Sequence, residues 1–236
     1  MSTPAGPTVS PVRVEGDLDA PLNRWLPLVK WALAIPHYIV LVFLWIGFFF
    51  TGVIAFFAIL FTGRYPRGLF DFGVGVLRWS WRVGFYSYSA LGTDRYPAFS
   101  LADDPDYPAR LEVAYPGELS RGLVLVKWWL LAIPHYVVVA VFAGGGWGEW
   151  TGMGAWSWVA SGGLIGVFIC FAGIALLFTG RYPQSIYDFV LGMNRWCFRV
   201  AAYVALMTDD YPPFRLDQGA HEPETAPELG PDTAVA

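Results

Sequence analysis

The sequence predicts an all-α membrane protein made of two tandem repeats. Each repeat is expected to be a transmembrane helical hairpin plus an amphipathic interfacial helix, with short cytoplasmic β segments. Of the 236 residues, 56% are hydrophobic and 14% are charged, whereas soluble domains carry about 25% charged residues. Aromatic residues, which favour the membrane–water boundary, make up 18%. The same motifs also occur twice in the same order.

The internal repeat sets the domain boundaries. The paired motifs are "LAIPHY" at 33–38 and 131–136, "FTGRYP" at 61–66 and 178–183, and "TDRYPAF" at 93–99 with "TDDYPPF" at 208–214. The second copy carries a Gly/Trp-rich insertion at 143–163. The predicted units are a disordered leader 1–11, repeat units 12–108 and 109–216, and a disordered acidic, Pro-rich tail 217–236.

Short alternating stretches begin and end each unit. "VRVE" at 12–15 and "ARLE" at 109–112 begin the units, and "FSL" at 99–101 and "FRL" at 214–216 end them. Alternation of apolar and polar residues is typical of a strand. These four stretches are the predicted β segments.

The longest apolar run of the first unit predicts a hairpin. The 33 residues between Lys30 and Arg64 include no Asp, Glu, Lys or Arg, and His37 is their one histidine. One crossing of the bilayer needs about 20 residues, so the run is too long for an ordinary span. It predicts two helices that turn near "WIGFFFTG" at 45–52, and the second unit is expected to repeat this arrangement with its turn in the insertion.

The distribution of basic residues predicts the orientation. All lysines and arginines lie outside the predicted hairpin interiors. By the positive-inside tendency, both termini are expected in the cytoplasm, with a multi-pass chain in the bacterial cytoplasmic membrane and its turns facing outward.

A third element in each unit, 69–91 and 186–206, carries a narrow polar stripe. Asp71, Arg78 and Arg82 lie at i, i+7 and i+11, and the second unit repeats the stripe with Asp188, Arg195 and Arg199. A helix in the membrane plane is favoured, because spanning would bury arginines at about 2.5–3.5 kcal/mol each. If these helices did span, each unit would have three crossings and the units would be inverted relative to one another.

The four arginines suggest an anion site. Like charges four residues apart repel one another, and one aspartate per stripe does not neutralise two arginines. The hypothesis is that Arg78, Arg82, Arg195 and Arg199 bind anionic lipid headgroups. The alternative is a structural network in which Asp71 and Asp188 pair with arginines of the other unit.

The PHY motifs place ionisable groups at membrane depth. Pro36 and Pro134 are expected to kink their helices, and His37 and His135 follow them. A structural histidine is the favoured interpretation, and a ligand or proton site is the alternative. Axial haem ligation by His37 and His135 is a further alternative; otherwise no cofactor and no metal site is expected.

The TGRYP motifs have a structural explanation in the sequence. Gly63 and Gly180 suit a helix end, and Arg64 and Arg181 can satisfy the last carbonyls. No catalytic motif is present in the sequence, and no basic surface suggests nucleic acid.

Taken together, "PHY", "FTGRYP", "DF…G…RW..R" and "TD.YPPF.L" resemble a bacterial membrane family known as domain of unknown function 4389. The resemblance covers about 12–101 and 109–216, as two copies. It implies an integral membrane protein and no established activity. The first copy departs from the pattern because it has "TDRYPAF" in place of "TDxYPPF", and the second copy departs from it by its Gly/Trp-rich insertion.

These observations favour a non-enzymatic membrane accessory or scaffold subunit. Its expected partners are membrane lipids and a membrane protein or a second copy of the chain. The alternatives are a small oligomeric transporter or channel that uses the two histidines, and a membrane enzyme or haem-binding protein.

Overall fold

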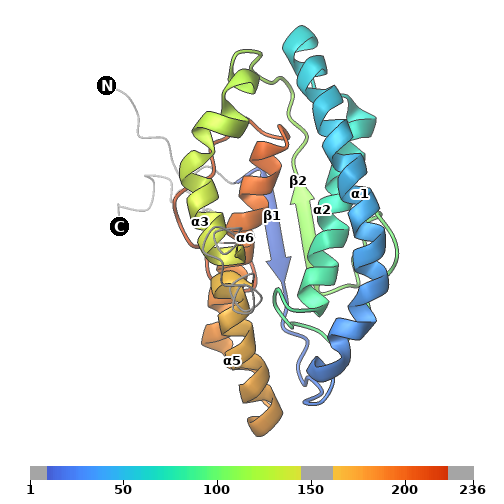
Figure 1. Cartoon of the computed structure of the whole chain (residues 1–236), viewed down its shortest axis with the longest axis vertical. Helices are drawn as coiled ribbons and strands as arrows, with labels where there is room; N and C mark the ends of the chain where they lie inside the picture. Colours follow the sequence, from blue (N-terminus) through green and yellow to red (C-terminus); the bar gives the residue numbers. More distant parts are fainter. Residues whose placement is uncertain (1–9, 145–161, 223–236) are drawn as a thin grey trace, which may run out of the picture.

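The computed structural model describes residues 10–144 and 162–222 (Figure 1). Within these ranges the chain is mostly helical, with one two-stranded sheet. The elements are β1 (Val12–Gly16), α1 (Pro27–Thr62), α2 (Arg67–Tyr86), β2 (Ala109–Val113), a 3₁₀ turn (Leu123–Leu125), a π-helical turn (Lys127–Leu131), α3 (Ile133–Ala143), α5 (Gly163–Thr179) and α6 (Gln184–Val204).

The first apolar run is one unbroken helix, so the hairpin predicted for this unit is wrong. Helix α1 has 36 residues and begins with Pro27, whose missing N–H suits the first turn. It ends at Thr62 and is capped by Gly63, which adopts the left-handed conformation with φ 72°. The predicted turn at 45–52 is helical throughout. The stretch has no proline or charged residue to stop a helix, and a continuing helix satisfies every backbone group.

The second repeat has the same long helix in two pieces. A Cβ placed on Gly163 would lie 2.2 Å from the backbone nitrogen of Gly144, so α5 begins where α3 ends, and the two follow one another in Figure 1. Gly144 and Gly163, the two described residues next to these helix ends, therefore lie side by side. The outward turn predicted here falls on 145–161, which lie outside the described residues.

A one-residue difference between the repeats explains the π-helical turn. Lys30 and Lys127 are 97 residues apart, whereas Pro36 and Pro134 are 98 apart. The extra residue falls in Lys127–Leu131, where the helix widens into a π turn. Such a bulge accommodates one inserted residue without changing the direction of the helix.

Helices α2 and α6 are the buried centre of the fold, so their polar stripes do not form the headgroup-facing surface that was predicted. Helix α2 packs along α1, and α6 packs along α3 and α5. Trp81, Arg82, Tyr187 and Arg195 are among the largest fully buried side chains of the described chain. The polar stripe is narrow because it contacts protein groups, as described below, instead of water.

The two strands exchange between the repeats. Strand β1 precedes α1 but packs on α6, whereas β2 packs on α2. They pair antiparallel, with Val14 opposite Leu111 at the centre. Val14 and Leu111 are also equivalent positions of the two repeats, 97 residues apart. The pairing of equivalent residues means that a pseudo-two-fold axis passes through this pair and relates the two repeats. The strands predicted at 12–15 and 109–112 are confirmed, and 99–101 and 214–216 are not strands.

The pseudo-two-fold axis makes the long helices antiparallel. A Cβ on Gly63, at the end of α1, would lie 3.5 Å from Arg121, which precedes α3. At the opposite end, a Cβ on Gly180 would lie 2.9 Å from Arg24, which precedes α1. Each end of the molecule thus combines the start of one long helix with the finish of the other (Figure 1).

One helix in the described ranges, α1, is long and apolar enough to cross a membrane by length and composition, and α3 and α5 are shorter apolar helices. This is the part of the predicted membrane architecture that the fold supports. The basic residues before and after α1, such as Arg24 and Arg64, lie at opposite ends of the molecule. The charge argument for placing both termini on one side therefore loses its basis.

Candidate functional site

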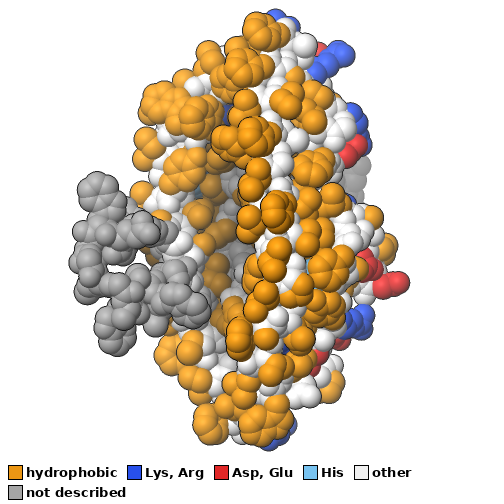
Figure 2. All heavy atoms as spheres, turned by 45° about the vertical axis from the view of Figure 1, so that its right-hand side comes forward, with side chains coloured by type: hydrophobic (Ala, Val, Ile, Leu, Met, Phe, Trp, Pro, Cys, Tyr) orange, Lys and Arg blue, Asp and Glu red, His pale blue; other side chains and the backbone are white. Residues whose placement is uncertain are grey.

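The most extensive unassigned feature is an exposed apolar face formed by α1, α3 and α5. Only 17% of the most apolar stretch of α1 is buried within the protein, and Phe43 and Phe61 are 69% and 72% exposed. Figure 2 shows apolar side chains over the whole length of this face, which is hollowed along its middle. Its other large members include Ile46, Phe49, Phe50, Ile54 and Phe57 of α1, Val137 and Val141 of α3, and Phe171, Ile174 and Phe178 of α5.

Inside this face, the repeated lysine of each long helix is locked by the repeated Thr–Asp pair. The Lys30 ammonium donates to the Thr93 carbonyl at 2.7 Å and forms an ion pair with Asp94 at 2.9 Å. Lys127 repeats these contacts with the Thr208 carbonyl at 2.8 Å and with Asp209 at 2.7 Å. Both lysine side chains are 1% exposed. The "VKW" and "TD" motifs are therefore two halves of one structural link.

The histidine of the first PHY motif lies in an aromatic cage. Its ring stacks on Phe99 at a centroid distance of 3.9 Å, and Tyr96 lies at 4.8 Å. The Trp79 indole donates to Nδ1 of His37 at 3.2 Å. A nitrogen that accepts a hydrogen bond carries no proton, so this imidazole is neutral with its hydrogen on Nε2.

The second cage is built from equivalent residues. His135 stacks on Phe214 at 4.5 Å and has Tyr211 at 4.7 Å and Trp196 at 5.9 Å. The Tyr211 hydroxyl donates to the Leu131 carbonyl at 3.2 Å, in the turn before Pro134. In the first repeat Tyr96 makes the same bond to Leu33. The "YP.F" segment thus closes over the proline–histidine turn of its own repeat.

The cages favour the structural interpretation of His37 and His135. Each ring is fully buried among aromatic side chains of its own repeat. Haem ligation by this pair would require both rings to face one cavity, and each ring has its described aromatic contacts within its own repeat. Among the described residues, no group of three or more His, Cys, Asp or Glu side chains could hold a metal ion.

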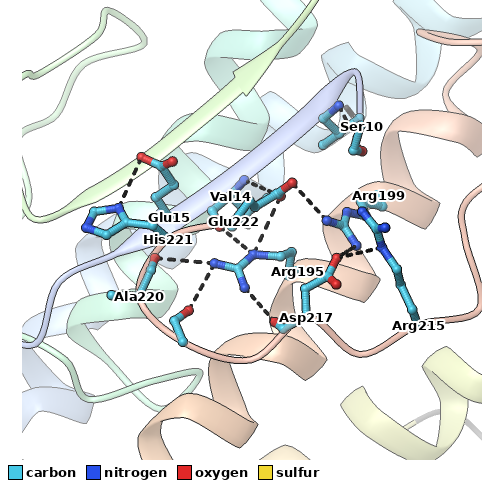
Figure 3. Close-up of polar contacts among 12 residues, drawn as sticks. Ser10, Val14, Glu15, Arg195, Arg199, Arg215, Asp217, Ala220, His221 and Glu222 are labelled. Carbon is cyan, nitrogen blue, oxygen red and sulfur yellow. Dashed lines mark hydrogen bonds and ion pairs between the residues drawn. The ribbon is translucent and has the colours of Figure 1, made fainter. Parts of the chain in front are cut away.

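The arginine stripe of α6 binds the chain's own C-terminal segment (Figure 3). Nε of Arg195 donates to the Val14 carbonyl at 2.8 Å, and its Nη atoms donate to the carbonyls of Asp217, Gly219 and Ala220. Arg199 forms ion pairs with Asp217 at 2.7 Å and with Glu222 at 2.9 Å. Burial lowers the pKa of Arg195, and the Glu222 carboxylate opposes that shift.

This segment corrects the boundary of the predicted disordered tail. Residues 217–222 lie against β1, where the Gly16 N–H donates to the Ala220 carbonyl at 3.1 Å. The acidic side chains that gave the tail its charge include Asp217 and Glu222, whose side chains are each 9% exposed. The remaining predicted tail, 223–236, lies outside the described residues.

The arginines of α2 have equivalent partners in the linker before β2. Nε of Arg78 donates to the Leu111 carbonyl at 3.2 Å and pairs with Asp103 at 3.3 Å. Arg82 bonds the Ser100 carbonyl and lies 4.0 Å from Asp104. All four arginines therefore contact carbonyls or carboxylates of the protein itself. The unneutralised charge from which lipid binding was inferred is absent in this fold.

The predicted aspartate partners are elsewhere. Asp71 pairs with Arg67 one turn before it, at 3.2 Å, and Asp188 accepts a hydrogen bond from Gln184 at 2.8 Å. In the described part of the chain, neither aspartate pairs with an arginine of the stripe. Arg64 is exposed and lies 4.0 Å from Glu118, and Arg181 is exposed.

Sequence reasoning missed the partners of the arginines because these partners are distant in the sequence, either in the strands, as Val14 and Leu111 are, or in loops without a fixed motif. A sequence signal was available for the lysine and histidine contacts. The "TD.YP.F" motif repeats together with "VKW" and "PHY", and residues that recur together are candidates for mutual contact.

A family model described as "Domain of unknown function (DUF4389)" matches residues 25–100 and 154–215, more than half of the chain. The chain belongs to this family. The two matched segments correspond to two tandem copies of the DUF4389 domain, as the resemblance predicts. The first contains all of α1 and α2, and the second contains α5 and α6 and begins after the PHY motif of its repeat.

The remaining comparisons assign no activity to this DUF4389 protein. No curated protein matches the sequence, and no solved structure matches it. Functional inference therefore depends on the chain's own surface and contacts.

Proposed function

We propose that this DUF4389 protein is a non-enzymatic accessory or scaffold protein embedded in a membrane through the exposed apolar face of α1, α3 and α5. The observation that carries the proposal is the exposure of α1, a 36-residue apolar helix of which one side alone is covered by protein. A core helix of a soluble protein would be mostly buried.

The energetics favour a nonaqueous environment for this face. Removing a large apolar side chain from water is worth about 1.5–3 kcal/mol. Soluble monomers rarely expose a continuous apolar patch larger than a few hundred Å², whereas this face runs the full length of the molecule (Figure 2). Lipid acyl chains can cover such a surface without any specific partner.

The polar contacts support a scaffold rather than an enzyme. The buried lysines and arginines of both repeats are occupied by carbonyls and carboxylates of the chain itself. The histidines on which the transporter interpretation depended are enclosed by aromatic rings. No observation in the described part of the chain favours transport over a structural role.

Fractionation of cells that express the chain tests membrane embedding. The protein is expected to stay in the membrane pellet through salt and alkaline carbonate washes and to be released by detergent. A variant with Phe49→Glu and Phe57→Glu on the apolar face should lose this resistance, because each charge would enter the acyl region.

The matched control is Arg13→Glu with Arg110→Glu, two equivalent exposed residues on β1 and β2. It should stay in the pellet. Recovery of the wild-type protein in the soluble fraction, or its release by carbonate alone, would overturn the proposal.

A further inference from the structure

We infer that the protein lies flat in one leaflet of the bilayer, with α1 and the α3–α5 pair parallel to the membrane plane, and that exposed arginines at its two ends bind anionic headgroups. This inference rests on the proposed membrane embedding and specifies its geometry. The occupant of the apolar face is then the acyl region of a single leaflet.

The first support is the level at which the charged strands lie. Trp45, near the middle of α1, donates to Ser80 of α2 at 3.1 Å. Two residues earlier on α2, Arg78 bonds the Leu111 carbonyl of β2 at 3.2 Å. The sheet therefore lies beside the middle of α1, on the side away from the apolar face.

That position is incompatible with a crossing perpendicular to the membrane. The strands carry the exposed residues Arg13, Arg110 and Glu112, and a crossing by α1 would bring them close to the bilayer centre. Each charge there costs about 2.5–3.5 kcal/mol on insertion scales. In the flat arrangement all three face water, because the charged side and the apolar side are opposite over the full length of the molecule.

The second support is the length and symmetry of the long helices. At 1.5 Å per residue α1 is about 54 Å long, well above the hydrocarbon thickness of about 30 Å. The pseudo-two-fold axis passes between Val14 and Leu111 and makes the long helices antiparallel. Lying flat, both repeats present the same face to the same leaflet.

The third support is the pair of exposed arginines at each end. Arg24 and Arg181 are exposed at one end, and Arg64 and Arg121 at the other. A spanning protein has its basic residues mainly on the cytoplasmic side, and here neither end is favoured. In the view of Figure 2, basic side chains lie at both ends and along one edge of the apolar face.

The same ends carry aromatic residues suited to the interface. Trp25 precedes α1 and Trp31 lies near its start, whereas Trp128 and Trp129 lie before α3; all four are 45–64% exposed. Tryptophan prefers the headgroup level, and arginine is well shaped for phosphate. The complementarity is with anionic phospholipid at both ends, through exposed arginines rather than the buried stripe of α2 and α6.

Depth measurements along α1 test the orientation. In a background with Cys170→Ser and Cys197→Ala, single cysteines replace Ala32, Phe43 or Phe61, and carry a fluorophore that doxyl-labelled lipids quench. A 100° step places these positions within about 20° of one another on the helix. In reconstituted vesicles of phosphatidylcholine and phosphatidylglycerol, equal quenching depth at all three positions is expected.

Each other result has a defined meaning. Deep quenching at the middle with shallow ends would overturn the flat orientation and leave membrane embedding intact. Labels that remain accessible to an aqueous quencher would overturn the proposed function as well. Labels shielded from both quenchers would mean that a second copy covers the face, and would overturn the lipid assignment.

The anionic headgroup is tested with two matched arginine pairs. Wild-type protein extracted in mild detergent from mixed vesicles is expected to retain phosphatidylglycerol in preference to phosphatidylcholine. Replacing Arg64 and Arg181 by Gln should remove that preference, whereas Arg13→Gln with Arg110→Gln on the strands should preserve it. If both variants lose the preference for phosphatidylglycerol equally, or if neither loses it, headgroup binding at the ends is refuted. This outcome does not depend on the result of the depth measurements.

Discussion

The link between Lys30 and Asp94 allows a quantitative prediction. Asp94→Asn would leave a lysine ammonium, 1% exposed, with the Thr93 carbonyl as its hydrogen-bond acceptor and the Tyr86 ring 5.0 Å away. Removing one partner of a buried ion pair costs about 3–5 kcal/mol. Because Asp94 is 27% exposed and the carbonyl bond at 2.7 Å remains, we expect a smaller loss of about 2–3 kcal/mol in this case.

This loss can be measured as a change in the thermal midpoint of unfolding. For a chain of this length 1 kcal/mol corresponds to about 2–4 °C, so Asp94→Asn should lower the midpoint by about 4–12 °C. The assay is intrinsic tryptophan fluorescence of detergent-solubilised protein at a fixed heating rate, because unfolding of such proteins is often irreversible. Lys30→Met with Asp94→Asn should recover part of the loss, since no buried charge is then left unpaired.

The control is Asp71→Asn, which breaks the exposed pair with Arg67, whose side chains are 57% and 66% exposed. Exposed pairs contribute about 0–1 kcal/mol, so its midpoint should change little. Equal midpoints for Asp94→Asn and Asp71→Asn would refute the reasoning that the repeated motifs form a buried structural link. Asp209→Asn tests the same link in the second repeat and should give a similar shift.

Three further predictions follow from other contacts. Arg195→Met should release the C-terminal segment 217–222 from β1, and limited proteolysis should then cut this segment faster than in Arg215→Met, which removes only an exposed partner of Asp217. Burial raises the pKa of the Cys197 thiol to about 12, so its reactive thiolate is scarce at pH 8. Iodoacetamide in detergent should therefore label the exposed Cys170 and leave Cys197 unmodified until the pH approaches 12. Labelling of both cysteines at pH 8 would contradict the packing of α6. Deleting 144–162 joins α3 directly to α5, whose ends already meet, and should lower the unfolding midpoint by no more than about 4 °C, or 1 kcal/mol; loss of folded protein would show that the two helices do not form one axis.

Several elements of the fold can be predicted from sequence alone. The repeat, the two strands that begin the units and the helices that contain the arginine stripes all follow from local patterns. The hairpin prediction was wrong because it was based on the length of an apolar run. Length shows how much chain avoids water, but it does not show where the chain reverses. In α1 the helix continues through Pro36 and through Gly47 and Gly52 of the predicted turn.

The candidate site was harder to predict, because its partners are far apart in the sequence. Arg195 and Val14 are separated by 181 residues, and the strand exchange that brings them together has no local signature. The same charge pattern on α6 would serve a helix at a membrane surface equally well. Only the packed chain distinguishes an arginine that faces headgroups from one that binds a strand.

By itself, the sequence determined that the chain is a tandem duplication with too much apolar surface for an ordinary soluble domain. Composition and local periodicity carry that information, because the preference of a side chain for water or for an apolar environment depends on its chemistry and not on its neighbours. The tertiary structure alone decided which residues fill the interior and which remain outside. Antiparallel pairing of β1 with β2 brings the two repeats together, neutralises their arginines within the protein, and leaves the apolar sides of α1, α3 and α5 on one common face. That outcome depends on contacts between distant segments, and no single stretch of the chain specifies it.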